Sequence, residues 1–211
     1  GVITIDFKDP AHPVVGQTAI DLAKHGFVMC ISDTKGSHAD LTDDYAAIRR
    51  EMESVAEQFG KKVLREVDED EFMKNIADIR SSCGDRAVLR AMHFYGDNAR
   101  VEKQAAALKA GDFETFKKYI IESGRSSYMY NQNVYSCKKA SEQPVSLALS
   151  LSEKLLDGCG AWRVHGGGFA GTIQAFVPLN KLDEYKDLME KVFGSGSCYI
   201  LSVRPVGGVE L

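Results

Sequence analysis

The chain of 211 residues is long enough for one large domain or two small ones, with a core that needs no disulfides. Its net charge of −4, without a basic run, argues against nucleic acid as a main partner. No apolar stretch approaches the roughly 18 residues of a membrane helix, and no signal-peptide pattern opens the chain. The five cysteines are scattered and lack any Cys-x-x-Cys spacing, so we expect reduced thiols in a cytoplasmic protein, with neither a disulfide framework nor a metal site.

The first forty residues predict strands. Residues 2–7 are β-like, residues 14–22 supply a second extended segment, and the continuous apolar run 26–32 suits a buried strand. A polar loop with His38 and Asp40 follows. The chain starts without methionine, directly on a strand-like run, and we therefore expect it to be a piece of a longer protein.

Helices dominate the middle of the chain. We expect a helix at residues 42–59 with Thr42 as N-cap and Gly60 as C-cap, and a second from 68 to about 83 that opens with Asp68 and Glu71 in capping-box positions. Three more are predicted at residues 85–110, 112–130 and 144–156. Asp112 caps the second of these, and Pro144 takes the first position of the third.

The C-terminal part predicts strand, glycine loop, strand, helix at 181–193, strand at 198–203 and a final short strand. Asn131-Gln132-Asn133 breaks the preceding helix, and residues 136–143 form a loop. A helical middle with a small terminal sheet covered by helices is an α+β arrangement.

The most distinctive stretch is Arg163-Val164-His165-Gly166-Gly167-Gly168-Phe169-Ala170-Gly171-Thr172, between two β-rich runs. Glycine allows positive φ and close approach of the backbone to a partner, and successive N–H groups in such a turn can form an anion-binding nest. It is neither a Walker A loop nor a dinucleotide fingerprint, because no Gly-Lys-Ser/Thr follows and no helix starts behind it. The loop predicts that the backbone approaches a ligand, without identifying that ligand.

Few side chains outside this loop indicate chemistry. Tyr45 begins a helix behind a polar loop, although its position alone favours a core role. His93 in the long helix favours a structural role, and His165 fits equally a ligand-facing residue and a strand residue. No paired carboxylates with a neighbouring base and no Ser-His-Asp arrangement are present, so the chemistry is not complete within this chain.

The stretch 163–172 resembles the third conserved motif of the GHMP small-molecule kinases, and of the galactokinases most closely. Residues 38–50, with Asp43-Asp44-Tyr45, look like the galactokinase segment that carries a sugar-contacting tyrosine. His93 with residues 97–101, then 105–116 and 122–126, continue the match in order. Departures occur at Asp97, Gly124, His165 and Ala170, where many members have other residues, and they leave the exact sugar open.

The resemblance implies helices packed on a small antiparallel, ferredoxin-like sheet, as in the C-terminal GHMP kinase domain, at residues 41–211. Residues 1–40 would be the last strands of the N-terminal domain. It implies an ATP- and Mg-dependent sugar kinase, with the missing N-terminal domain, the sugar and ATP as partners.

The resemblance also assigns roles. Tyr45 would contact the sugar, Arg163 and His165 would support the site, and the catalytic residues would lie upstream of Gly1, so this chain alone would be inactive. The phosphate and substrate loop would consist of Gly166, Gly167, Gly168, Phe169, Ala170 and Gly171. Two alternatives stay open: a galactokinase-like sensor that binds sugar and ATP without turnover, and a sister GHMP kinase for another sugar.

Overall fold

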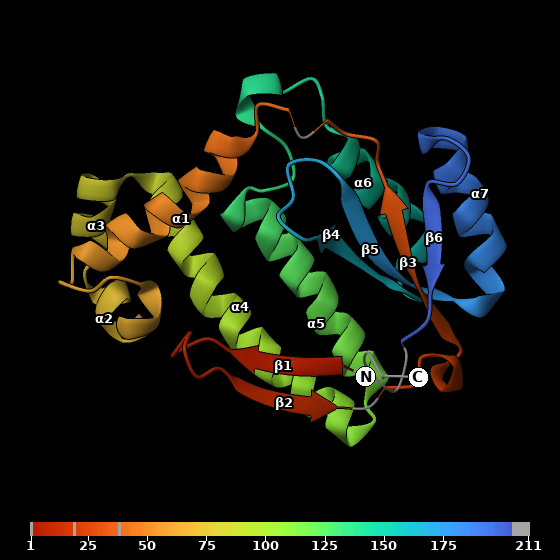
Figure 1. Cartoon of the computed structure of the whole chain (residues 1–211), viewed down its shortest axis with the longest axis horizontal. Helices are drawn as coiled ribbons and strands as arrows, with labels where there is room; N and C mark the ends of the chain where they lie inside the picture. Colours follow the sequence, from red (N-terminus) through yellow and green to blue (C-terminus); the bar gives the residue numbers. More distant parts are fainter. Residues whose placement is uncertain (1, 19, 38, 204–211) are drawn as a thin grey trace.

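The computed structural model describes residues 2–18, 20–37 and 39–203, and its centre is a four-stranded antiparallel sheet (Figure 1). The strands run in the order β4 (Ala161–His165), β5 (Thr172–Pro178), β3 (Phe27–Asp33) and β6 (Cys198–Leu201). The early strand β3 is therefore central, and its pairing with β5 runs from Phe27 opposite Pro178 to Asp33 opposite Thr172.

The two faces of this sheet are covered by different helices. Alternation of side chains along each strand sends Trp162 and Val164 into one core, with α6 (Pro144–Leu156) and α7 (Leu182–Phe193). It sends Ala161 and Phe176 into another core, with α5 (Phe113–Ser126) and the end of α4 (Asp85–Ala110). The sheet is thus buried on both faces near β4, the strand that leads into the glycine loop.

A helical layer lies beside the sheet, at the left of Figure 1. It consists of α1 (Thr42–Glu57), α2 (Glu69–Lys74), α3 (Ile76–Cys83) and the first half of α4. Its own core gathers apolar residues at helical spacing: Val55, Ala56, Leu64, Val67, Phe72, Ile79, Ala87, Val88, Ala91 and Tyr95. Because α1 starts close to the glycine loop and ends in this core, it connects the loop to the helical layer.

A separate two-stranded sheet, β1 (Val2–Asp6) and β2 (Val14–Thr18), runs along α4 in Figure 1. Several of its apolar side chains are exposed: Ile3, Ile5, Phe7, Val14 and Val15.

The domain boundary expected at residue 40 stays a prediction. Since β3 precedes residue 40 and pairs with β5 and β6, the four-stranded sheet draws strands from both sides of that position.

The predicted α+β class, with helices on a small antiparallel sheet, is confirmed. Helix α4 has its predicted bounds, Asp112 accepts a hydrogen bond from the Thr115 N–H, and Pro144 begins α6. The Asp68 side chain accepts a hydrogen bond from the Glu71 N–H. Short polar side chains next to helix starts were therefore reliable signals at these positions.

Other predicted details were wrong. Thr42 is the first residue of α1 rather than its N-cap, Leu41 holds the cap position, and no side chain caps the helix. The helix predicted from 68 to 83 is two helices, because the chain bends at Asn75, whose side chain bonds the Glu71 carbonyl. The helix predicted to reach 130 ends at Ser126 and continues as one π-helical turn, Ser127–Asn131.

Residues 2–18, 20–37 and 39–203 contain no helix that combines the length and apolar character needed to cross a membrane. His38 and the final short strand predicted after residue 203 lie outside the described residues.

Candidate functional site

The glycine loop connects β4 to β5 in a conformation that needs glycine. Gly166, Gly168 and Gly171 have φ values of +72°, +81° and +84°, and Phe169 adopts +58° without being glycine. At its base, His165 pairs with Thr172 across the two strands, and the His165 Nδ1 lies 3.0 Å from the Thr172 Oγ1. Two paired strands therefore hold the loop at the end where β4 stops and β5 begins.

Helix α1 holds the loop from one side. The Tyr45 hydroxyl donates a hydrogen bond of 2.8 Å to the Gly168 carbonyl, and its ring meets Phe169 edge-on at 5.3 Å. Phe169 and Ala170 are buried in a small cluster with Leu41. Burial of the Tyr45 side chain raises its pKa, so the hydroxyl stays protonated and remains a donor at neutral pH.

Asn133 and Thr34 hold the loop from the other sides. The Asn133 backbone carbonyl accepts from the Phe169 N–H, and its side-chain Nδ2 donates to the Gly167 carbonyl at 3.1 Å. Thr34 donates to the Gly171 carbonyl with both its N–H, at 2.8 Å, and its Oγ1, at 2.7 Å. The carbonyl oxygens of Gly167, Gly168 and Gly171 are thereby directed to donors within the protein.

The N–H groups at the tip of the loop are different. Among the described residues, those of Gly166, Gly167 and Gly168 have no hydrogen-bond partner, and Gly166 and Gly167 are exposed. Three consecutive free amides on a fixed loop are donors with partial positive charge, and such runs of amides can form a nest for an anion such as phosphate. No side chain at Gly167 could keep this shape, because a Cβ there would lie 2.7 Å from the Tyr45 ring.

Arg163, two residues before the loop, turns away from it. Its side chain is largely buried beside α4 and α5, its Nε donates to the Val164 carbonyl at 3.2 Å, and burial lowers its pKa while Asp97 opposes that shift. Gly124 allows this packing, since a Cβ there would lie 2.9 Å from the Arg163 Cβ. The structure therefore brings Tyr45 and the loop together, and places Arg163 in a neighbouring polar cluster.

That cluster lies between α4 and α5. Asp97 accepts from Ser123 Oγ at 2.6 Å and from Arg100 at 3.0 Å, and the His93 Nδ1 lies 2.9 Å from the Ser126 Oγ. Burial lowers the pKa of His93, with Asp97 acting in the opposite direction. His93 is thus buried against protein side chains, which agrees with the structural role predicted for it.

Sequence reasoning did not identify Asn133 or Thr34 as part of this site. Asn133 was noted only within a stretch that ends a helix, and Thr34 only within a polar loop. Both side chains bond backbone groups of residues more than thirty positions away. The sequence shows that these residues can form hydrogen bonds, but it does not show which distant group each one bonds.

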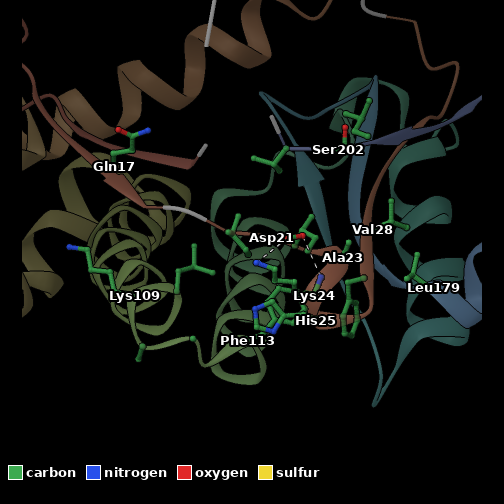
Figure 2. A pocket seen from close by; sticks show the side chains of 18 residues that line it. Gln17, Asp21, Ala23, Lys24, His25, Val28, Lys109, Phe113, Leu179 and Ser202 are labelled. Atoms are coloured by element: carbon green, nitrogen blue, oxygen red, sulfur yellow. Dashed lines mark hydrogen bonds and ion pairs between the residues drawn. The ribbon is translucent and has the colours of Figure 1, made fainter. Parts of the chain in front are cut away.

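A separate pocket of about 880 Å³ lies at the opposite end of β3, near the starts of β3 and α5 (Figure 2). Lys24, His25, Phe113 and Leu179 line it, and the His25 ring stacks on Phe113 at 4.8 Å. None of the site residues predicted from the sequence lines this pocket.

Within the described residues, no group of three His, Cys, Asp or Glu side chains is placed to hold a metal ion.

No protein-family model matches the chain, but individual proteins do. It is 26% identical to a galactokinase from Actinobacillus pleuropneumoniae over 165 residues, which are 78% of this chain and 41% of that protein. It is 28% identical to human galactokinase over 192 residues, which are 91% and 46% of the two chains.

The fold also has a close counterpart. The crystal structure of Lactococcus lactis galactokinase complexed with galactose matches 90% of this chain and 47% of that one, with a TM-score of 0.65 and 19% identity. The resemblance to galactokinases inferred from the sequence motifs is confirmed, and the chain spans less than half the length of these relatives.

Proposed function

We propose that this chain is the C-terminal portion of a cytoplasmic, ATP-dependent sugar kinase of the galactokinase type. The reaction would move the γ-phosphoryl group of ATP to the anomeric hydroxyl of a galactose-like sugar. The observation that carries the proposal is the row of free amides at Gly166, Gly167 and Gly168, held against Tyr45 on α1. The similarity to galactokinases over most of the chain supports it.

The geometry supports a role for each part of the loop. The Tyr45 hydroxyl donates to Gly168, and the galactokinase resemblance implies that the same tyrosine would contact a sugar hydroxyl. The free amides of Gly166 to Gly168 would stabilise negative charge where sugar oxygen and triphosphate meet. Phe169 and Ala170 would anchor the loop through their buried side chains, and Gly171 through Thr34.

Two residues before the loop would support it without touching substrate. Arg163 would orient β4 against α4 and α5, and His165 would close the base of the loop through Thr172. Such indirect support matters in phosphoryl transfer, because catalysis there depends on positioning and on charge stabilisation.

In the reaction, a bond forms between the sugar oxygen and the γ-phosphorus while the bond from that phosphorus to ADP breaks. The hydroxyl proton would go to a base that the galactokinase resemblance assigns upstream of Gly1. Mg²⁺, when bound with ATP, neutralises phosphate charge, and the proposal assigns no ligand for it to residues 2–18, 20–37 and 39–203. We therefore expect this chain alone to be inactive.

We also propose a domain arrangement, which rests on the resemblance to galactokinases. Residues 1–40 would end the N-terminal domain and residues 41–211 would form the C-terminal domain, with β3 contributed to the sheet of the latter. The missing half would then supply the acid/base group and the loop that holds ATP.

The test is ATP consumption by the full-length protein that contains this chain. Galactose is the expected substrate, with arabinose, N-acetylgalactosamine and mevalonate as controls. Strong turnover with galactose alone supports the proposal, and turnover with another sugar indicates a sister GHMP kinase. If no substrate is turned over but sugar and ATP stabilise the protein against heat, the kinase proposal is overturned and the sensor alternative is favoured.

A further inference from the structure

The segment Asn131-Gln132-Asn133 does more than end a helix. It follows the π-helical turn Ser127–Asn131, an uncommon element that often occurs at functional sites, and Gln132 has a φ of +54°. This left-handed residue turns the chain so that Asn131 and Asn133 are both buried, with Asn133 only 4% exposed. Each of these two buried side-chain amides requires hydrogen-bond partners.

Asn133 finds its partners in the glycine loop. Its backbone carbonyl accepts from the Phe169 N–H, and its Nδ2 donates to the Gly167 carbonyl at 3.1 Å, so it holds the loop on both sides of Gly168. A Cβ at Gly168 would lie 1.9 Å from the Asn133 carbonyl oxygen. The contact is therefore possible only with glycine at 168.

These contacts determine where one loop amide points. In a planar trans peptide, the carbonyl and the N–H point in opposite directions. Because the Gly167 carbonyl faces the Asn133 Nδ2, the N–H of Gly168, which belongs to the same peptide, points away from Asn133. The next peptide is fixed at both ends, by Tyr45 at the Gly168 carbonyl and by Asn133 at the Phe169 N–H.

The position of Asn133 is itself held by a buried ion pair. The Arg90 side chain is 2% exposed; its Nε donates to the Asn131 carbonyl at 3.1 Å and its Nη1 to Glu51 at 2.8 Å. Glu51 and Tyr45 both lie on α1. One helix thus reaches the loop directly through Tyr45 and indirectly through Glu51, Arg90 and the asparagine segment.

We infer that Asn133 is a positioning residue for the phosphoryl transfer, an inference that rests on the proposed function. It orients the peptide between Gly167 and Gly168 so that the Gly168 N–H faces the transferred group and not the protein interior. Its buried Oδ1 has no hydrogen-bond partner among the described residues, so the side chain is placed for its Nδ2 contact and not for complete satisfaction of its polar atoms.

Asn131 is the matched control. It lies in the same segment, is also buried, and its Oδ1 also lacks a partner within the part of the chain that the structure describes. Its hydrogen bond to Arg90 uses the backbone carbonyl, which survives any substitution. Asn131→Ala therefore reproduces the loss of a buried amide without touching the loop.

The experiment compares Asn133→Ala with Asn131→Ala in the full-length protein. We expect Asn133→Ala to lower kcat by about 10- to 100-fold, because a displacement near 1 Å at a reacting centre can have that effect. The KM for sugar and for ATP should change by less than about threefold, since the loop remains in place. Asn131→Ala should keep kcat within about twofold. If Asn133→Ala does not fold, Asn133→Asp, of nearly equal volume but without the Nδ2 donor, takes its place.

Hydrogen exchange at Phe169 and Ala170 separates this inference from the kinase proposal. The readout is the N–H of Phe169 and of Ala170, which are hydrogen-bonded to the Asn133 and Gly168 carbonyls. We expect faster exchange of these two amides in Asn133→Ala than in Asn131→Ala, whether or not any sugar is turned over. An unchanged kcat in Asn133→Ala, or equal losses in the two variants, would overturn the positioning role. If the wild-type protein turns over no substrate, the proposed function fails and the positioning role in transfer fails with it, while the exchange data still decide whether Asn133 holds the loop.

Discussion

The Tyr45 hydroxyl lies 2.8 Å from the carbonyl oxygen of Gly168, and this bond joins the first turn of α1 to the tip of the glycine loop. The helix and the loop are 123 positions apart in the chain. The bond therefore couples the position of the Gly168 carbonyl to the position of α1.

Removing this hydroxyl should affect the sugar more than the nucleotide. In Tyr45→Phe, the Gly168 carbonyl keeps the Ala170 N–H as a donor, and the proposed contact of the tyrosine hydroxyl with the sugar is lost. We expect the KM for sugar to rise by about 5- to 10-fold, equivalent to roughly 1 kcal/mol for one hydrogen bond. The KM for ATP should change by less than about twofold. Steady-state kinetics of the full-length protein measure both, and a larger effect on ATP would move Tyr45 out of the sugar pocket.

Gly168 and Gly166 should respond differently to a methyl group. Both have positive φ, so alanine at either position costs about 1 kcal/mol of backbone strain. Only at 168 does the Cβ collide with a backbone atom, the Asn133 carbonyl oxygen, whereas the space around a Cβ at 166 is open.

We therefore expect Gly168→Ala to lower kcat/KM by about 100-fold and to destabilise the fold by an additional 1–3 kcal/mol from overpacking. Gly166→Ala, as the matched control, should show the strain alone. Kinetics and urea unfolding of the two variants provide the comparison. Equal losses at both positions would mean that strain, and not the Asn133 contact, governs the loop.

Glu51 should matter for stability far more than its helix neighbour Glu53. Glu51→Ala leaves the Arg90 guanidinium buried without its partner, which costs about 3–5 kcal/mol. Glu53 pairs with Arg49, whose side chain is 83% exposed, so Glu53→Ala should cost no more than about 0.5 kcal/mol. Chemical denaturation of both variants measures the difference. Similar losses would show that the Glu51–Arg90 pair does not hold the helical layer.

His93 should make stability depend on pH in mildly acidic solution. Burial lowers its pKa below the ordinary 6.5, so between the folded pKa and 6.5 the unfolded chain binds a proton that the folded chain does not. Stability must then fall as the pH drops from about 7 through this window. In His93→Gln this contribution is absent, and the unfolding free energy should decline less steeply between pH 7 and 5. Identical slopes for the two proteins in that range would contradict the lowered pKa.

Local chemistry in the sequence was sufficient for much of the fold. The apolar period, the cap Asp112 and the first-turn Pro144 predicted the helices, and the β-rich runs that flank the glycines predicted β4 and β5. The break at Asn75 was missed because it depends on the bond from the Asn75 side chain to the Glu71 carbonyl, which helical spacing does not report. The π-helical turn after Ser126 was missed because it is a local change in backbone hydrogen bonding. The prediction of Thr42 as a cap was wrong, since α1 begins one residue earlier than expected, with Leu41 at the cap position and no side-chain hydrogen bond there.

The site was predictable in part for a similar reason. Glycines at 166–168 are visible because only glycine fits such a loop, and Tyr45 came from the family resemblance. The hydrogen bonds from Asn133 and Thr34 join segments that meet only in the folded chain. Nothing local distinguishes an asparagine that holds a distant loop from one that merely ends a helix.

The central place of β3 has a consequence for how the chain folds. Its partner β5 is synthesised after all of α1 to α6, and its other neighbour β6 comes later still. At about 5–20 residues per second on the ribosome, β3 waits on the order of ten seconds for its first neighbour. Contacts of such long range slow folding, so the helical segment should gain structure first and the sheet should close last. The glycine loop, which joins β4 to β5, would then take its final shape only in the closing step of folding.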